Sequence, residues 1–413
     1  MFFTRKRLKL YLGALVIIQV CTVISGLAIL CTVRGRYIDL RTFYTAGYML
    51  RTRQAALLYD YPTEQRLQTS LVSYDPRALP MMSPPFTALL FVPLSHLSIE
   101  EAHVVFAIVD IVLLAVCVVL LQPFLTSLSA RWRPAPTLLI FSFLPAWVAI
   151  LVGQLSVVLL LLYCIAFVCL RRKHDVVAGL VVSLAMMKFQ VAIPVAILFL
   201  LWRQWRFIAG FLTGSAVLAA LSIRIVGTAP FLAYLHSLYS MTSAVSADPV
   251  NQLRFAIIPE QMPNLYGTIF MLTRGAAWCH ILILAISLVL FLWTARQRPS
   301  LALALMTAML VSYHLFFYDL TLLVLPLAML ADHLLRNPDS TQSPDLRLLT
   351  TRVSLGMLLL SPMLRLLTGA NDAWLLTLPM LALTVSSAWW PSLHGEPEPA
   401  PMADAAVGLA AAM

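Results

Sequence analysis

The chain has 413 residues, of which 61% are hydrophobic and only 11% are charged, and its mean hydropathy is +0.88. Soluble domains are roughly 45–50% apolar and about 25% charged, so this composition excludes an ordinary soluble protein and requires lipid around most of the chain. The formal net charge of +10 would suggest nucleic acid in a soluble protein. Here we interpret it as basic residues in cytoplasmic loops and expect no nucleic-acid partner.

The apolar segments predict an all-α polytopic membrane protein with about a dozen transmembrane helices, because a helix needs about 20 apolar residues to cross a bilayer. The first apolar run follows a basic N-terminus and is longer than a signal-peptide core, so we expect it to be retained. Close pairs of runs around Gly153, Lys188 and His314 are expected to be hairpins. The predicted spans are 10–33, 101–122, 136–151, 154–170, 175–188, 189–202, 207–226, 276–295, 299–313, 315–333, 350–367 and 373–390.

Basic residues indicate the orientation of these spans. With the N-terminus in the cytoplasm, every predicted cytoplasmic segment is basic, whereas the short outward turns at 152–153, 314 and 368–372 contain no Lys or Arg. This asymmetry is the positive-inside rule, and long loops are exempt from it. The basic segments are 5–7, Arg131 with Arg133, 171–173, Arg203 with Arg206, Arg296 with Arg298, and 336–352.

We therefore expect one integral domain over residues 1–390 of a multi-pass protein in the plasma (inner) membrane. Its two long extracytoplasmic loops are 34–100 and 227–275. A disordered cytoplasmic tail rich in Pro and Ala is expected over 391–413.

Strongly polar residues inside the apolar runs fall almost entirely on the outward side of this topology. Ionisable groups at membrane depth are costly and tend to mark functional sites or polar cavities. We therefore expect one polar chamber that opens away from the cytoplasm. Its candidate residues are Asp39, Gln154, Lys188, Gln190, His314 and Asp319.

Each candidate also has a simpler interpretation. Asp39 can flank a helix in a hydrated loop, Lys188 can extend to the outer headgroups, and Gln154 can satisfy backbone groups at a turn. His314 and Asp319 are five residues apart, so they do not stack on a regular helix and do not suggest a metal pair. We expect neither a metal nor a cofactor.

The first outward loop predicts two interfacial helices. Phe43, Gly47, Leu50 and Gln54 occur at helical spacing, with aromatic residues beside them. Paired prolines then precede an apolar run from 86 to 97 that is too short to cross a bilayer. Two such helices at the outer surface would form a platform where a lipid-borne substrate meets a polar partner.

The order of these motifs resembles that of glycosyltransferase family 87, the membrane mannosyltransferases of the C-type glycosyltransferase superfamily. The matching features extend over roughly residues 35 to 330, and it is their order, not any one of them, that is specific. They are Asp39 after the first span, an aromatic helix with Tyr59-Asp60, Pro84-Pro85 before an apolar run, Gly153-Gln154, Ala178-Gly179 before Lys188, Trp202 to Arg206, Asn251-Gln252, and His314 with Asp319 to Leu323.

The resemblance implies a C-type fold and transfer of a sugar, expected to be mannose, from a polyprenyl-phosphate-linked donor to a lipid or glycan acceptor outside the cytoplasm. It also implies Asp39 as general base and Lys188 as a phosphate-contacting cation, and the base agrees with what inverting sugar transfer requires. The sequence departs from the family at Met82-Ser83, where many members have Tyr. The expected substrate-binding residues are Arg41, Tyr44, Tyr59, Asp60, Gln154, Lys188, Gln190, His314 and Asp319.

Two other functions fit the hydropathy. A transporter or flippase of a lipid-linked precursor would use the same outward cavity without chemistry, but the chain has no internal repeats and few polar residues in the inner half of its spans. A structural scaffold explains the apolar segments but not the one-sided polar residues.

Overall fold

The structure is a computed structural model that describes residues 39–72, 79–243, 258–336, 346–360 and 370–388, with scattered positions from 13 to 28. Within these ranges every regular element is a helix, which confirms the all-α prediction. Most of the predicted first span 10–33, the Asn251-Gln252 pair, parts of 227–275 and of 350–367, and the tail 391–413 lie outside the described residues.

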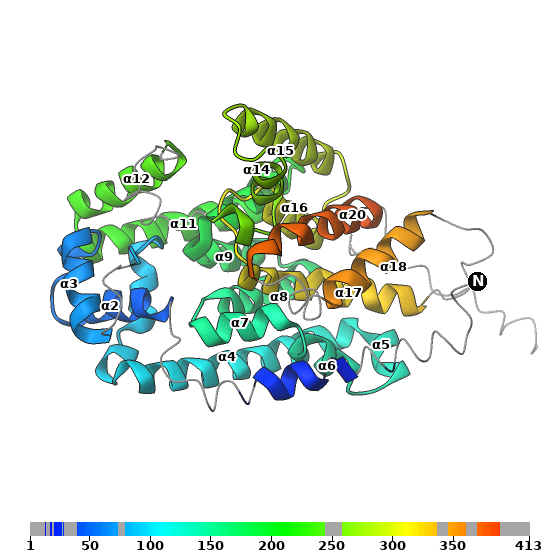
Figure 1. Cartoon of the computed structure of the whole chain (residues 1–413), viewed down its shortest axis with the longest axis horizontal. Helices are drawn as coiled ribbons and strands as arrows, with labels where there is room; N and C mark the ends of the chain where they lie inside the picture. The colour runs from blue at the N-terminus through cyan, green and yellow to red at the C-terminus, as the bar shows by residue number, and fades with distance from the viewer. Residues whose placement is uncertain are drawn as a thin grey trace, which may run out of the picture.

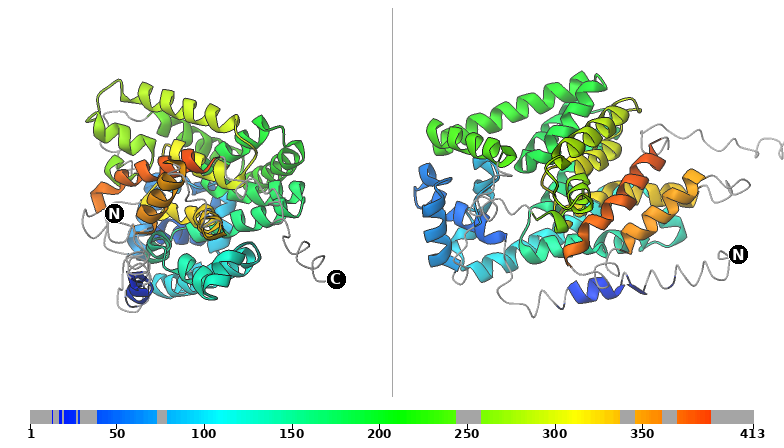
Figure 2. Two further views of the ribbon diagram at one scale, coloured as in Figure 1. Left: turned by 90° about the vertical axis from the view of Figure 1, so that its right-hand side faces the viewer. Right: turned by 45° about the horizontal axis from the view of Figure 1, so that its top comes forward.

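The two ends of the molecule differ in the elements that they contain (Figure 1). One end, at the left of Figure 1, holds α2 (Leu40–Arg51) and α3 (Tyr61–Val72), with α12 (Thr228–Ser243) nearby. The opposite end holds α5 (Thr126–Arg131) and α18 (Leu346–Leu359). Long helices connect the two ends, and the second view of Figure 2 shows the same division.

The remaining elements pack between these ends. The other α-helices are α4 (Ile99–Leu121), α6 (Ala135–Phe141), α7 (Leu144–Val152), α8 (Ser156–Arg171), α9 (Asp175–Leu184), α10 (Phe189–Leu201), α11 (Trp205–Val226), α14 (Leu265–Leu272), α15 (Cys279–Ala295), α16 (Leu301–Val311), α17 (Val324–Arg336) and α20 (Thr377–Ser387). Short 3₁₀ helices are η1 (Ala55–Leu57), η2 (Pro85–Phe91), η3 (Leu94–His96), η4 (Gln122–Phe124), η5 (Ala185–Lys188), η6 (Pro259–Gln261), η7 (Phe317–Leu323) and η9 (Ala370–Leu376).

Four helical runs among the described residues are long and apolar enough to cross a membrane, and the bent pair α6–α7 makes a fifth. This supports a membrane protein but does not confirm the predicted dozen spans. Several other apolar runs form shorter helices in the described part of the chain, such as α16 with 11 residues. The four runs are Ile99–Phe124, Asp175–Leu201, Trp205–Val226 and Phe317–Arg336.

The run Asp175–Leu201 folds back on itself at Lys188. The backbone at Lys188 is not helical (φ −129°, ψ 67°). Gly179 before the turn packs against the backbone of Phe207, and the ring of Phe199 after the turn stacks on the ring of Phe207 at 4.0 Å. Since both arms contact the same residue of α11, they form the predicted hairpin, and its tip carries Lys188.

The predicted interfacial helices are present but differ from expectation. The first, α2, is largely buried instead of lying on a surface, and its Gly47 lies against the backbone of Phe91. Phe43 also stacks on Phe91, with ring centroids 5.0 Å apart. The second is split into η2 and η3, which are separated by Val92 and Pro93. Close packing of α2 against η2 therefore replaces the expected flat platform.

Arg171 and Arg336, from two of the basic segments, lie near α5 at the end opposite α2 (Figure 1). Helix α8 begins beside Asp319 and, with 16 residues, extends roughly 24 Å to Arg171. There the Arg171 guanidinium lies 5.6 Å from the ring centroid of Phe124. Arg336, at the end of α17, pairs with Asp332 at 3.0 Å and lies 3.4 Å from the hydroxyl of Thr126.

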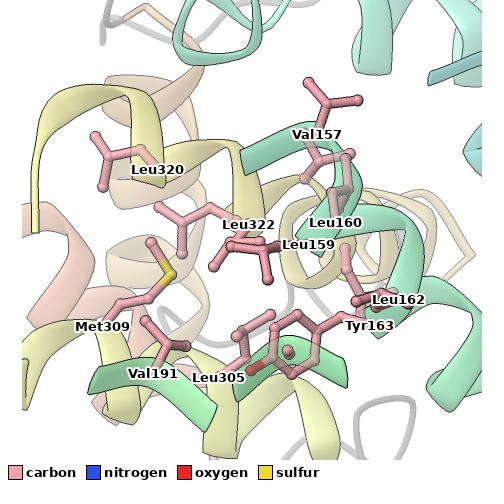
Figure 3. Packing of buried hydrophobic residues seen from close by; sticks show 14 of the residues in the cluster. Val157, Leu159, Leu160, Leu162, Tyr163, Val191, Leu305, Met309, Leu320 and Leu322 are labelled. Carbon is pink, nitrogen blue, oxygen red and sulfur yellow. The ribbon is translucent and has the colours of Figure 1, made fainter. Parts of the chain in front are cut away.

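A buried apolar cluster fixes the helices that carry the polar residues (Figure 3). It joins α8, α10, α16 and η7 through side chains such as Leu159, Val191, Leu305 and Leu322, which are at most 1% exposed. In a bilayer, close packing and interhelical hydrogen bonds hold helices together. This packing sets the position of η7, and therefore of the residues at its start.

Candidate active site

A cavity of about 130 Å³ lies beside the start of α2. Five separate parts of the chain line it: the start of α2, the segment 79–83, the turn between α7 and α8, the Lys188 turn, and the loop before η7 together with the start of η7. The lining residues are Asp39, Thr42, Phe43, Leu79, Pro80, Met82, Ser83, Gln154, Leu155, Met187, Lys188, Phe189, Gln190, Tyr313, His314, Phe316 and Tyr318.

Asp39 is the residue immediately before α2, and both its backbone and its side chain are held. Its N–H donates to the carbonyl of Val152 at 3.0 Å. Its Oδ2 accepts a hydrogen bond from Nε2 of Gln154 at 3.0 Å, and the same Nε2 lies 3.2 Å from the hydroxyl of Tyr318. Gly153 ends α7 with φ of 74°, a conformation that favours glycine, and this turn aims Gln154 at Asp39.

The surroundings of Asp39 suit a base. Burial raises the pKa of the carboxyl above its ordinary value, while the hydrogen bond from Gln154 and the positive charge of Lys188 oppose this rise. Tyr318 also lowers the pKa by hydrogen bonding, and the negative charge of Asp319 raises it slightly. A carboxylate with a raised pKa accepts a proton more strongly than an ordinary one, as a general base must.

Lys188 is fixed at the cavity wall by Asp319. Its ammonium forms an ion pair with Oδ1 of Asp319 and lies 5.0 Å from the ring centroid of Tyr318. Asp319 is fully buried, and it also accepts hydrogen bonds from the Ser156 hydroxyl at 2.9 Å and the Phe316 N–H at 3.0 Å. Asp319 itself does not line the cavity. It therefore acts here as a support that aims the ammonium.

The loop before η7 presents His314 to the cavity. Its carbonyl accepts hydrogen bonds from the Ser312 hydroxyl at 3.1 Å and from Nε2 of Gln190 at 3.4 Å. Asn264 donates to the carbonyl of Ser312 at 2.7 Å, and the His314 ring meets the ring of Phe316 edge-on at 4.9 Å. These contacts fix the loop and hence the direction of the imidazole.

Besides Asp319, four predicted binding residues do not line the cavity. The Tyr44 hydroxyl donates to the carbonyl of Leu97 at 2.8 Å, and the Tyr59 hydroxyl donates to the carbonyl of Ser83 at 2.9 Å. Asp60 accepts from the N–H of Thr63 at 3.1 Å at the start of α3, and Arg41 is half-buried in α2 away from the cavity.

Sequence reasoning missed Tyr318, Thr42 and Ser83, which line the cavity. The sequence signal for Tyr318 is its position directly before Asp319 in a predicted motif. Among the described residues, no group of three or more His, Cys, Asp or Glu side chains is placed to hold a metal ion.

Comparison with known proteins gives one match. The sequence model of glycosyltransferase family 87 matches residues 83–326, which is more than half of the chain. The matched range includes Gln154, Lys188 and His314 but begins after Asp39. No curated protein and no solved structure matches the chain. The match confirms the family resemblance drawn from the motifs.

Proposed function

Because the chain belongs to glycosyltransferase family 87, a family of membrane glycosyltransferases, we propose that it is an inverting hexosyltransferase. The donor is a sugar, expected to be mannose, linked to polyprenyl phosphate, and the acceptor is a lipid or a glycan. The basic end of the molecule is expected to face the cytoplasm. The cavity then lies on the extracytoplasmic side of the plasma membrane, with the surrounding lipids as partners.

One observation carries this proposal: a half-buried carboxylate and a fixed ammonium share one small cavity. Asp39 and Lys188 both line it. Sugar transfer from a lipid phosphate needs a base for the acceptor hydroxyl and a cation for the departing phosphate. It needs no separate acid, because a phosphate is a competent leaving group. In this proposal Asp39 is the base and Lys188 is the cation.

The proposed step balances as follows. The carboxylate of Asp39 takes the proton of an acceptor hydroxyl, and the acceptor oxygen forms a bond to C1 of the sugar from the face opposite the phosphate. The bond between C1 and the phosphate oxygen breaks, and its electron pair leaves with polyprenyl phosphate. The ammonium of Lys188 stabilises the negative charge that develops on that oxygen. The configuration at C1 is inverted.

The other cavity residues position the reactants in this proposal. Gln154 and Tyr318 orient the carboxylate of Asp39, because Gln154 hydrogen-bonds to it at 3.0 Å and also contacts the tyrosine hydroxyl. His314 is placed to bind sugar hydroxyls or phosphate oxygens. Positioning of this kind accounts for a large share of rate enhancement in many enzymes.

Purified protein incubated with labelled polyprenyl-phosphate mannose and a mixed lipid acceptor tests the proposal. We expect label on a new product and free polyprenyl phosphate in equal amounts. A transporter or flippase would instead bind the intact donor and move it between leaflets of a proteoliposome. Movement of intact donor without any transfer, in the presence of several acceptor classes, would favour that alternative.

A further inference from the structure

One wall of the cavity is a segment without regular secondary structure. Residues Leu79 to Ser83 form no helix, yet Leu79, Pro80, Met82 and Ser83 all line the cavity. Backbone N–H and C=O groups away from water must find hydrogen-bond partners. A segment of this kind is fixed only if other parts of the protein provide those partners.

Two side chains of α3 provide partners for three of these backbone groups. Gln68 holds both backbone groups of Leu79: its Nε2 donates to the carbonyl at 2.8 Å, and its Oε1 accepts from the N–H at 3.0 Å. The Glu64 carboxylate accepts from the N–H of Met81, with Oε1 at 3.2 Å. Pro80, between these two residues, has no N–H to satisfy.

The spacing of these contacts follows helix geometry. Glu64 and Gln68 are four residues apart, so they lie on the same face of α3. Leu79 and Met81 are two residues apart, and both donate their N–H groups to side chains on this face. Two successive turns of the helix thus hold two alternate backbone positions of the wall. In this way side chains of α3 bond the backbone N–H and C=O groups of the wall, as the backbone of a paired strand does in a sheet.

The burial of these two side chains indicates a specific role. Glu64 is 3% exposed and Gln68 is 4% exposed. Glu and Gln are seldom buried this deeply unless they are paired. Both side chains bond backbone atoms of the wall, and holding that segment accounts for their burial.

The wall is also tied to the helix that carries the proposed base. The Thr42 hydroxyl donates to the carbonyl of Leu79 at 3.1 Å, and Thr42 lies one turn after Asp39 on α2. At the other end of the wall, Tyr59 donates to the carbonyl of Ser83 at 2.9 Å. The position of the wall relative to Asp39 therefore depends on the same set of side-chain bonds.

We infer that Glu64 and Gln68 are positioning residues that hold Leu79–Ser83 as a fixed wall of the reaction cavity, so that substrate fits against it beside Asp39. The functional half of this inference rests on the proposed sugar transfer. Loss of either side chain frees the wall, which weakens substrate binding more than it slows the chemical step. We name this pair of residues the clamp.

Hydrogen exchange of the full-length protein in detergent tests the clamp without any substrate. In Glu64→Ala and Gln68→Ala we expect the amides of Leu79 and Met81 to exchange about ten-fold faster, because each loses a buried hydrogen bond. Glu64→Gln keeps an acceptor for Met81 and should restore protection. Thr69→Ala is the matched control, since Thr69 is exposed on the same helix and bonds only its own helix among the recorded contacts.

Transfer kinetics on the same variants test the functional half. We expect the KM for donor or acceptor to rise roughly ten-fold in Glu64→Ala and Gln68→Ala with a smaller change in kcat. Unchanged exchange in both alanine variants would overturn the clamp. Faster exchange with wild-type KM values for both substrates would overturn its role in binding. Wild-type protein that transfers no sugar would refute the proposed function, while the exchange result would still decide whether the clamp exists.

Discussion

Nε2 of Gln154 lies 3.0 Å from Oδ2 of Asp39, although 115 positions separate the two residues in the sequence. The contact joins the turn between α7 and α8 to the residue that precedes α2. A second contact, from the N–H of Asp39 to the carbonyl of Val152, fixes the same junction at 3.0 Å. The proposed base is therefore held by the turn between α7 and α8.

Removing the charge of Asp39 should abolish transfer and leave the fold intact. In Asp39→Asn the side chain keeps its size but no longer accepts the acceptor proton. Loss of a general base typically lowers kcat by about 10²–10⁴-fold. The measurement is kcat with labelled donor, together with the melting temperature in detergent. Transfer at the wild-type rate would remove Asp39 from the mechanism.

Gln154 should tune the pH dependence of transfer. The proposed base acts when ionised, so activity is present above the pKa of Asp39 and is lost as pH falls through it. Because the hydrogen bond from Gln154 lowers this pKa against the effect of burial, Gln154→Leu should raise the pKa. The acid limb of the rate profile then moves to higher pH.

Gln190→Leu is the control for that profile. Gln190 also lines the cavity, but its amide donates to the carbonyl of His314 at 3.4 Å and has no recorded contact with Asp39. We expect the acid limb of the Gln190→Leu rate profile to occur at the wild-type pH, even if the transfer rate itself falls. An acid limb that is identical in Gln154→Leu and wild type would show that the titrating group is not Asp39.

The sequence and the structure agree most closely where chemistry is concentrated in short motifs. Asp39, Gln154, Lys188 and His314 were each recognisable as polar residues in apolar surroundings, and all four line the same cavity. Helix rotation was harder to predict. Tyr44 points to Leu97 instead of the cavity, because the packing of α2 against η2 determines which face is turned inward.

The clamp could not be predicted from the sequence. Glu64 and Gln68 lie in a short helix of low hydropathy, which suggests an exposed surface, and nothing local indicates that they face residues 79–81. The number of membrane spans is difficult to predict for a related reason. Hydropathy finds apolar runs, but it does not distinguish a full crossing from a short helix such as α16.

The ion pair of Lys188 and Asp319 should show strong coupling between its members. Asp319→Asn leaves the ammonium of Lys188 without its carboxylate in a site where that side chain is only 11% exposed. Breaking a buried pair by removing one member destabilises proteins by about 3–5 kcal/mol. Lys188→Gln combined with Asp319→Asn should regain part of that stability, as measured by thermal unfolding in detergent.

Activity separates the two roles within this pair. The double variant should remain inactive, because the departing phosphate has no cation; loss of such a group lowers kcat by about 10²–10³-fold. Lys188→Arg keeps the positive charge and should retain part of the activity. Transfer by Lys188→Gln at the wild-type rate would contradict the assignment of Lys188 to the phosphate.

Close packing of α2 against η2 should make Gly47 intolerant of a side chain. A Cβ at Gly47 would lie 2.5 Å from the backbone carbon and oxygen of Phe91, and backbone atoms cannot move aside as a side chain can. Overpacking of this kind costs about 1–3 kcal/mol of stability. It also pushes apart the elements that hold Asp39 and the wall. Gly47→Ala should therefore lower both the melting temperature and the transfer rate.

Gly356→Ala is the matched control, because Gly356 also lies in a helix but a Cβ there meets nothing within 4 Å. Since Ala favours helix more than Gly does, by about 1 kcal/mol, the control should be neutral or slightly stabilising. Equal melting temperatures for the two variants would contradict the close approach of α2 and η2.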